Sequence, residues 1–343
     1  MNKDFDIGTK RINSASHKLC VKTSTTWDIE DEISESLKMI ISQYSKNNNL
    51  HFLIDEKHPE FFKGSLSNEN KILGERIKLL PDGDQIARAG FSLFAKNLRF
   101  NTDHDHEWDV CYENTSGLKT YLYSEEKIHL EQEKKFKLVQ KFSKHYDKII
   151  QNVENNLEKI EYLALYTLLK TFIRVGNYHY YLRNSHKGLT TLQKKDISVE
   201  GNIVFFDFIG KDGVPHNIKK DFSKAYILNL KQILSSRKKD DFVFTGSRGK
   251  PLHSEDFSSI FFNITQDHFY PHIIRSHHAD SICLDYLNGK INIKDPEKLF
   301  IEIAKDLGHK KYNKKKEQWE ISPSITIKSY IYPEYVKTIR AKK

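Results

Sequence analysis

Two stretches of the chain combine residue types that can act together on a phosphodiester. The first, RVGNYHYYLRNSHKGLTTLQKKDISVEGNIVFFDFIGKDGV, runs from Arg174 to Val214 and carries Lys211 in its GKDG turn. The second carries His309 in LGHKK and Tyr330 in KSYIYP. A guanidinium binds phosphate oxygens through paired, geometrically fixed hydrogen bonds. A lysine can donate a proton and a tyrosine can form a covalent intermediate.

The order of these motifs is more specific than any one of them. RVGN, GLTTL, the GKDG turn and KSYIYP follow one another along the chain. In this order they resemble the catalytic domain of type IB DNA topoisomerases, particularly the short bacterial and poxvirus-like members. A weaker match is FVFTGSRGKPLHSEDFSSIF, which is similar to the family's segment before its second arginine. The resemblance covers roughly residues 125–343 well and the first 80 or so residues poorly.

The resemblance implies a role for each of five residues. Tyr330 is the implied nucleophile, which forms a 3′-phosphotyrosyl link, and Lys211 is the implied general acid for the leaving 5′-oxygen. Arg174 and Arg275, the latter in HIIRSHHAD, are implied to bind the non-bridging oxygens, and His309 to contact a phosphate oxygen. These types suit the reaction, because negative charge develops on the phosphate under attack. A phenol, with a pKa near 10, needs positive charge nearby to react as an oxyanion.

The implied activity is the relaxation of supercoiled DNA, without ATP, metal or other cofactor. Arginines would supply the charge stabilisation, and the phosphotyrosine would conserve the bond energy for religation. The implied partner is double-stranded DNA, bound by a monomer. A separate motif, DHDHEWD, places His104 and His106 among carboxylates. Two histidines on one strand face can bind a metal, but a polar loop is the preferred interpretation, so no metal site is predicted.

Alternative interpretations remain at several positions. His272 forms an HxxR pattern with Arg275, and this pattern is typical of tyrosine site-specific recombinases. His272 and the nearby His278 are therefore further candidates for catalytic residues. The same chemistry could therefore serve a recombinase or resolvase. Tyr332 and Tyr335 lie close to the proposed nucleophile. A DNA-binding module that has lost activity is a third possibility, although all five implied residue types are present.

The segment between His309 and Tyr330 is long and basic. It contains KKYNKKKEQWEISP, in which Lys310, Lys311 and Lys314 are candidates for contacts with DNA. A solvated loop would explain the same charge pattern.

The composition is compatible with a polyanionic partner. The formal net charge is +9, with 55 basic and 46 acidic residues, and neutralising phosphates releases counterions from DNA. The three cysteines are dispersed without CxxC spacing, which indicates a reducing compartment. No signal-peptide pattern and no apolar run of about 18 residues is present. The cytoplasm, with the protein associated with the nucleoid, or another reducing compartment that contains DNA is expected.

The predicted fold class is α+β, in two domains. Residues 1–123 are expected to form a smaller, partly β, DNA-clamping domain, and residues 124–343 a mainly helical catalytic domain with a small β-hairpin sheet. Within the first domain, residues 1–27 look loosely ordered. Helical spacing from Ile29 to Tyr44, with Asp28 as N-cap, predicts a helix there. In the second domain, the IVFFDFI strand and the following Asp-Gly predict a hairpin.

Overall fold

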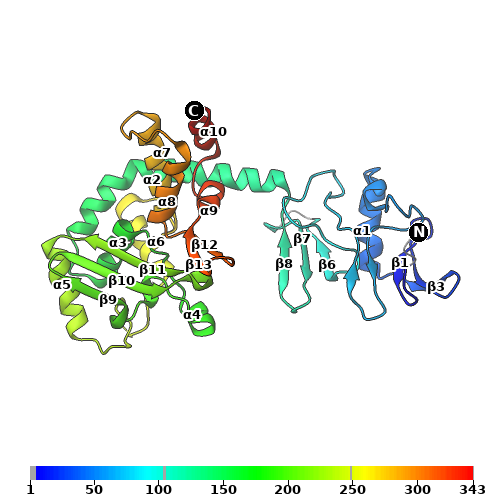
Figure 1. Ribbon diagram of the computed structural model, residues 1–343, viewed down its shortest axis with the longest axis horizontal. Coiled ribbons are helices and arrows are strands. Elements are labelled where there is room, and N and C mark those ends of the chain that lie inside the picture. The colour runs from blue at the N-terminus through cyan, green and yellow to red at the C-terminus, as the bar shows by residue number, and fades with distance from the viewer. Residues whose placement is uncertain (1–4, 103–105, 248, 343) are drawn as a thin grey trace. The chain divides into compact units, whose positions relative to one another are not determined.

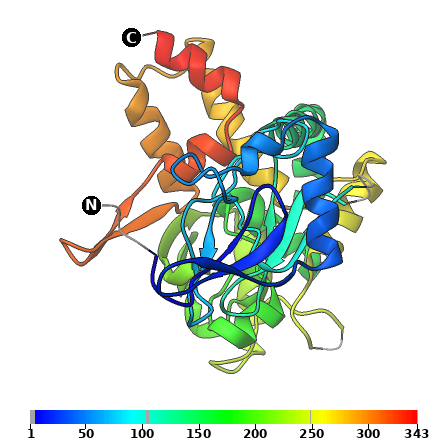
Figure 2. The same cartoon turned by 90° about the vertical axis from the view of Figure 1, so that its right-hand side faces the viewer.

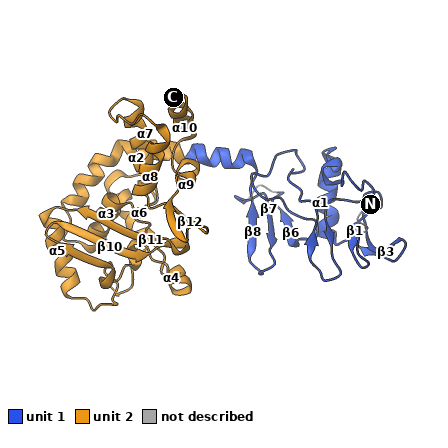
Figure 3. Cartoon of the chain, in the orientation of Figure 1, with its two compact units in different colours: residues 1–134 blue, residues 135–343 orange. Residues whose placement is uncertain are grey.

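The computed structural model describes residues 5–102, 106–247 and 249–342. The chain forms two compact units, residues 1–134 and 135–343 (Figure 3). The division falls inside helix α2 (Glu125–Glu154), which begins just after the domain boundary expected at residue 123. His104, of the DHDHEWD motif, lies outside the described residues.

Unit 1 consists of two antiparallel sheets and a helix. One sheet has the strand order β3-β2-β1-β4-β5 and the other β6-β7-β8. The elements are β1 (Lys10–Ile12), β2 (Lys18–Lys22), β3 (Trp27–Glu32), α1 (Glu35–Lys46), β4 (Ser65–Leu66), β5 (Ile72–Leu73), β6 (Lys96–Phe100), β7 (Val110–Glu113) and β8 (Lys119–Leu122). Buried residues of α1 and both sheets share one hydrophobic core, so this unit is the partly β domain that the sequence predicts.

The first strands of unit 1 correct two sequence-based predictions. The segment expected to be loosely ordered contains β1 and β2, and the predicted helix start is strand β3 instead. Helix α1 begins only at Glu35, where the Ser34 side chain caps the amide of Leu37. Pairing with β2 places Ile29 opposite Cys20 and leaves it exposed, so its helical spacing was coincidental. The ion pair of Lys10 with Glu30, at 2.6 Å, adds cross-strand attraction that local periodicity cannot reveal.

Unit 2 is mainly helical around a three-stranded sheet of order β11-β10-β9 (Figure 1). Its first elements are α2, α3 (Ile160–Thr171), α4 (Tyr178–Asn184), β9 (Ile197–Glu200), β10 (Ile203–Ile209), β11 (Pro215–Asp221), α5 (Lys224–Ser235) and α6 (Ser254–Thr265). The buried alternation of β10, through Val204, Phe206 and Phe208, joins helices α2, α3, α5 and α6 in one core. The α+β class is confirmed. No helix in the described part of the chain is long and apolar enough to cross a membrane.

The C-terminal part of unit 2 forms a second helical cluster. It consists of α7 (Ile273–Leu287), α8 (Pro296–Asp306), α9 (Ser324–Ser329) and α10 (Pro333–Ala341). Tyr330 and Ile331 are buried between these helices. A two-stranded hairpin, β12 (Lys310–Asn313) and β13 (Gln318–Ile321), separates α8 from α9 and extends from the rest of the unit (Figure 2, orange-red). At its base the Ser322 amide donates to the His309 carbonyl at 3.0 Å.

Candidate active site

Tyr330 lies at the centre of a cluster of cationic and imidazole side chains. It follows the last turn of α9, and only 3% of its surface is exposed. Its ring centroid is 4.8 Å from that of His309 and 5.2 Å from that of His272. The guanidinium carbon of Arg275 lies 5.3 Å from the same ring centroid. The structure therefore gathers two predicted residues, Arg275 and His309, and the alternative candidate His272 around the phenol of Tyr330.

Arg275 is held by three acceptors from two separate segments of the chain. It lies in the first turn of α7 and donates to the carbonyl of Phe172, to the carbonyl of Leu307 at 2.9 Å, and to His309 Nε2 at 2.9 Å. Burial lowers its pKa to about 10, so the guanidinium remains protonated at neutral pH. The side chain thus carries a full positive charge in a fixed orientation beside Tyr330.

The hydrogen bonds of His309 define its tautomer. Because a guanidinium can only donate, Nε2 of His309 accepts from Arg275 and the ring proton lies on Nδ1. Nδ1 then donates to Thr326 Oγ1 at 2.7 Å. Burial, with the charges of Arg275 and Arg174, lowers the pKa of His309 to about 2, so the ring is neutral. Thr326, fully buried on α9, is a site residue that the sequence did not single out.

The resting tautomer has a consequence for phosphate binding. With Nε2 of His309 accepting from Arg275, that nitrogen is not available as a donor. It can donate to a phosphate oxygen only after the ring gains a proton or exchanges tautomer. A bound phosphate favours the proton, because a nearby negative charge raises the pKa of an imidazole.

Arg174 is positioned by a close crossing of two chain segments. The RVGN segment leaves α3 through Phe172, whose φ of 56° turns the chain. The carbonyls of Arg174 and Val175 accept from the amides of Leu189 and Thr190, both at 2.8 Å. The RVGN and GLTTL motifs are therefore adjacent in space, and each fixes the backbone of the other.

Two glycines make that crossing possible. A Cβ on Gly188 would lie 2.5 Å from the Gly176 Cα and 2.7 Å from the Arg174 carbonyl oxygen. Gly176 itself has a φ of 94°, in the left-handed region that favours glycine. Any side chain at residue 188 would therefore push apart the backbone that carries Arg174.

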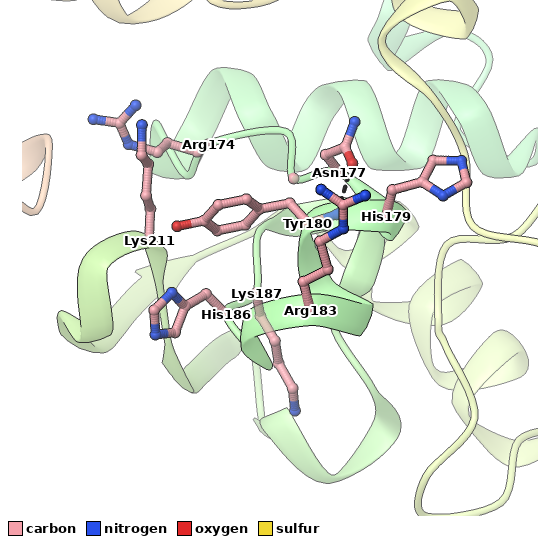
Figure 4. Close-up of a pocket in the computed structure, with 9 residues that line it drawn as sticks. Arg174, Asn177, His179, Tyr180, Arg183, His186, Lys187 and Lys211 are labelled. Carbon is pink, nitrogen blue, oxygen red and sulfur yellow. Dashed lines mark hydrogen bonds between the residues drawn. The ribbon is translucent and has the colours of Figure 1, made fainter. Parts of the chain in front are cut away.

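Lys211 lies at the turn between β10 and β11, in the predicted hairpin. Asp212 and Gly213 both have positive φ there, at 62° and 76°. Lys211 and Arg174 line a pocket of about 500 Å³, and Figure 4 shows Lys211 extending towards the Arg174 guanidinium. The other lining residues are Gly176, Asn177, His179, Tyr180, Arg183, His186 and Lys187. The pocket is thus rich in cationic groups and suits an anion.

The Lys211 turn and the His309 loop pack on one another through His216. The His216 ring stacks on Phe208, with centroids 4.9 Å apart. A Cβ on Gly308 would lie 2.4 Å from that ring. Lys310, at the start of β12, donates to the Pro215 carbonyl at 2.7 Å. These contacts link the segments that carry two of the predicted site residues.

Electrostatics connects the pocket to the Tyr330 cluster. The positive charge of Arg174 contributes to lowering the pKa of both Arg275 and His309, after the larger effect of burial. Burial also lowers the pKa of His272 to about 3, with contributions from Arg275, Arg174 and Lys211 among others. All five residues implied by the resemblance therefore belong to one electropositive region of unit 2.

The remaining candidates have other placements. His278 stacks on Phe172, and its Nε2 lies within hydrogen-bond distance of the Asp306 carboxylate, at 2.9 Å. Lys311 and Lys314 are exposed on the β12–β13 hairpin. His106 stacks on Trp108 in unit 1. Among residues 5–102, 106–247 and 249–342, no group of three His, Cys, Asp or Glu side chains could hold a metal ion.

Comparison with known proteins identifies the family. An arginine, a histidine and a tyrosine pack together in unit 2, which also carries a pocket lined by several cationic side chains. Residues 124–322 match the model of the eukaryotic DNA topoisomerase I catalytic core. The match spans more than half of the chain, and the chain belongs to this family. It includes four of the five implied residues and ends before Tyr330.

Individual relatives are more distant. The chain is 26% identical over 137 residues to DNA topoisomerase 1 of Rabbit fibroma virus (strain Kasza) and 25% identical over 138 residues to DNA topoisomerase I of Monkeypox virus. Each match covers 38% of this chain and 44% of the relative, so the chain spans less than half the length of these curated relatives. Two structures of the XerH site-specific recombinase bound to difH substrates are weakly similar, at 15% identity and a TM-score of 0.34. They cover 48% of this chain and 45% and 46% of the recombinase chains.

Proposed function

We propose that this protein is a type IB topoisomerase that relaxes supercoiled DNA by cutting and resealing one strand. The observation that carries the proposal is the packing of Tyr330 against Arg275 and His309, beside the pocket lined by Arg174 and Lys211. Each residue type needed for metal-free transesterification is present in this region. Membership of the topoisomerase I family supports the same assignment.

The proposed reaction forms one phosphodiester bond and breaks another. The Tyr330 oxygen attacks the phosphorus and forms the 3′-phosphotyrosyl bond, while the bond to the 5′-oxygen breaks. The phenol proton leaves to solvent, and Lys211 gives a proton to the departing 5′-oxygen. Arg174 and Arg275 bind the non-bridging oxygens as their charge grows. Religation is the reverse reaction and consumes no ATP, because the phosphotyrosine retains the bond energy.

We further propose that the partner is double-stranded DNA, engaged by a monomer. The catalytic region is strongly cationic, and phosphate contacts supply much of the affinity in such complexes. Unit 1 is proposed to bind the same duplex. A reducing compartment that contains DNA suits the three cysteines, all of which are buried and free.

The test is relaxation of a negatively supercoiled plasmid by purified protein in EDTA and without ATP. The wild type is expected to relax the plasmid catalytically, whereas Tyr330→Phe should bind DNA but neither cleave nor relax it. Tyr332→Phe and Tyr335→Phe are the matched controls, because both phenols lie within five residues of Tyr330, and both variants should remain active. Relaxation by Tyr330→Phe would refute the assignment of the nucleophile.

A tyrosine recombinase is the second candidate, and one contact favours it. His272, of the HxxR pattern, lies against the ring of Tyr330. A recombinase would cleave specific duplexes and exchange strands between them without relaxing plasmids of arbitrary sequence. Covalent trapping on a defined duplex, together with an absence of plasmid relaxation, would support this candidate over the topoisomerase.

A further inference from the structure

Lys135, on helix α2, contacts the proposed nucleophile from a distant part of the sequence. Its Nζ donates to the backbone carbonyl of Ser329, the residue before Tyr330. The same nitrogen lies 5.3 Å from the centroid of the Tyr330 ring. Some 194 residues separate the lysine from that carbonyl, so only the fold brings them together.

The charge of Lys135 is poorly compensated. Within the described chain its Nζ makes no ion pair, and the one carboxylate that influences it is Asp280 of α7. His272, the N-cap residue of α7, is close enough for the charge of Lys135 to lower its pKa, and Nζ also lies over the rings of Tyr330 and Phe136. Arg275 lies over the same Tyr330 ring. Burial lowers the pKa of Lys135 to about 8 against the opposing effect of Asp280. Burying an ammonium group costs stability, and an apolar residue would fill this position of α2 at lower cost.

We propose that Lys135 is a positioning residue for the nucleophile. Its hydrogen bond fixes the Ser329–Tyr330 peptide, and its positive charge, over the face of the ring, stabilises the phenolate that attacks the phosphate. This inference rests on the proposed function of Tyr330. It adds a cation to the site from a helix outside the motifs that carry the family resemblance.

Two physical effects explain how the charge of Lys135 would stabilise the phenolate of Tyr330. A cation over an aromatic face is attracted by the electrons of the ring, and the attraction grows as the ring gains negative charge. The effect is strong where water is excluded, and Tyr330 is almost fully buried. A lysine that only satisfied the Ser329 carbonyl would leave the reactivity of the phenol independent of its charge.

The test compares Lys135→Met, which keeps the length of the side chain without the charge, with Lys135→Arg, which keeps the charge at every pH used. Lys137→Met is the matched control, because Lys137 is exposed on the same helix. Each variant is mixed in excess with a duplex that traps the covalent complex, and the rate of single-turnover cleavage is measured. Lys135→Met should cleave about 10- to 100-fold more slowly at pH 7.5, equivalent to one or two pKa units of lost phenolate stabilisation. Lys135→Arg should recover most of the rate, and equilibrium binding to DNA should be unchanged.

The pH dependence separates this role from a structural one. Between pH 7.5 and 9 the wild-type lysine loses its proton, so its advantage over Lys135→Met should shrink, while Lys135→Arg should keep its advantage. Asp280, whose pKa burial raises to about 7, is mostly ionised over this range, and His272 stays neutral. Thermal melting of Lys135→Met should occur at or above the wild-type temperature, because a partly buried charge has been removed.

Three outcomes would overturn the inference. Cleavage by Lys135→Met at the wild-type rate would show that the charge has no role. A loss of rate that is the same at every pH, accompanied by a lower melting temperature, would indicate a purely structural residue. If the wild type cleaves no duplex at all, the proposed function fails and this inference fails with it; cleavage by the wild type and not by Tyr330→Phe isolates the role of Lys135.

Discussion

At the scale of single residues, the site is a chain of directed hydrogen bonds. It runs from the Phe172 carbonyl through Arg275 and His309 to Thr326. His309 Nδ1 has Thr326 Oγ1 as its acceptor, so the orientation of the imidazole depends on the threonine. Thr326 therefore fixes which nitrogen of His309 faces Arg275 and the proposed phosphate position, although it is not expected to touch DNA.

Thr326→Val provides the test of this control. The substitution keeps the side-chain shape but leaves the buried Nδ1–H of His309 without an acceptor, which should cost roughly 1–3 kcal/mol of stability. Single-turnover cleavage should slow about tenfold or more as the ring loses its orientation. Thr326→Ser, which keeps the hydroxyl, should retain most of the rate. Equal cleavage by the valine and serine variants would contradict the role of the hydroxyl.

Sequence patterns identified the motif residues but not their supports. Three of the proposed active-site residues lie in recognisable motifs that follow a fixed order along the chain, namely Arg275, His309 and Tyr330. Thr326 lies in the unremarkable segment SPSITIK, and Lys135 in a helix crowded with lysine and glutamate. Neither has a local signal, since the role proposed for each arises from contacts across the fold, which a linear pattern does not record.

At the scale of elements, the β12–β13 hairpin connects the segment that carries His309 to the helix that precedes Tyr330. Its Lys316 and Asn313 side chains are bound to Glu320. Lys311, Lys314 and Lys315 are exposed. The hairpin leaves directly from His309 and returns to the helix that precedes Tyr330, so a duplex in the site would pass close to it.

Removing the lysine charges of the hairpin should measurably weaken its electrostatic attraction to DNA. The variant Lys311→Gln, Lys314→Gln, Lys315→Gln should bind duplex DNA more weakly. The slope of log K against log salt should fall by roughly 0.9 for each DNA phosphate that the hairpin no longer neutralises. The control replaces Lys224, Lys231 and Lys239, which are also exposed, by glutamine. If the two triple variants show the same slope, the hairpin does not bind phosphates and is simply solvated.

Element prediction succeeded where the signals were local. The hairpin that carries Lys211 followed from an alternating strand and an Asp-Gly pair, and both strands were found. The first strands of unit 1 were missed, because β1 and β3 are defined by pairing with β2 and contain few alternating apolar residues. The basic insert was expected as a loop, and its cross-strand pair of Tyr312 with Trp319 makes it a hairpin instead.

At the scale of the whole molecule, burial of neutral histidines links folding to pH. The pKa values of His216, His272, His277 and His309 are all lowered, to between about 2 and about 4, chiefly by burial. In the unfolded chain these rings titrate near 6.5. As the pH falls, the unfolded state therefore binds protons at a higher pH than the folded state does. The stability that the neutral rings provide is present above pH 6.5 and is lost as the pH falls below that value.

The expected result is a marked loss of stability in mild acid. Between pH 7 and pH 5 the four histidines favour unfolding, while Asp280, whose folded pKa is about 7, opposes them by one proton. The net change should be on the order of 5 kcal/mol, at about 1.4 kcal/mol per proton and pH unit. Urea unfolding followed by far-ultraviolet circular dichroism at the two pH values measures it. A free energy of unfolding that does not change between pH 5 and pH 7 would be incompatible with four neutral buried rings.

The bond between the Ser322 amide and the His309 carbonyl bears on how relatives of this protein can be recognised. It closes the base of the hairpin, so the chain re-enters the core where it left, whatever length of polypeptide lies outside. Insertions or deletions at residues 311–320 would then alter the spacing of histidine and tyrosine in the sequence without altering their separation in space. A search that demands a set interval between these two residues would reject true relatives, whereas one that allows a gap of any length there would retain them.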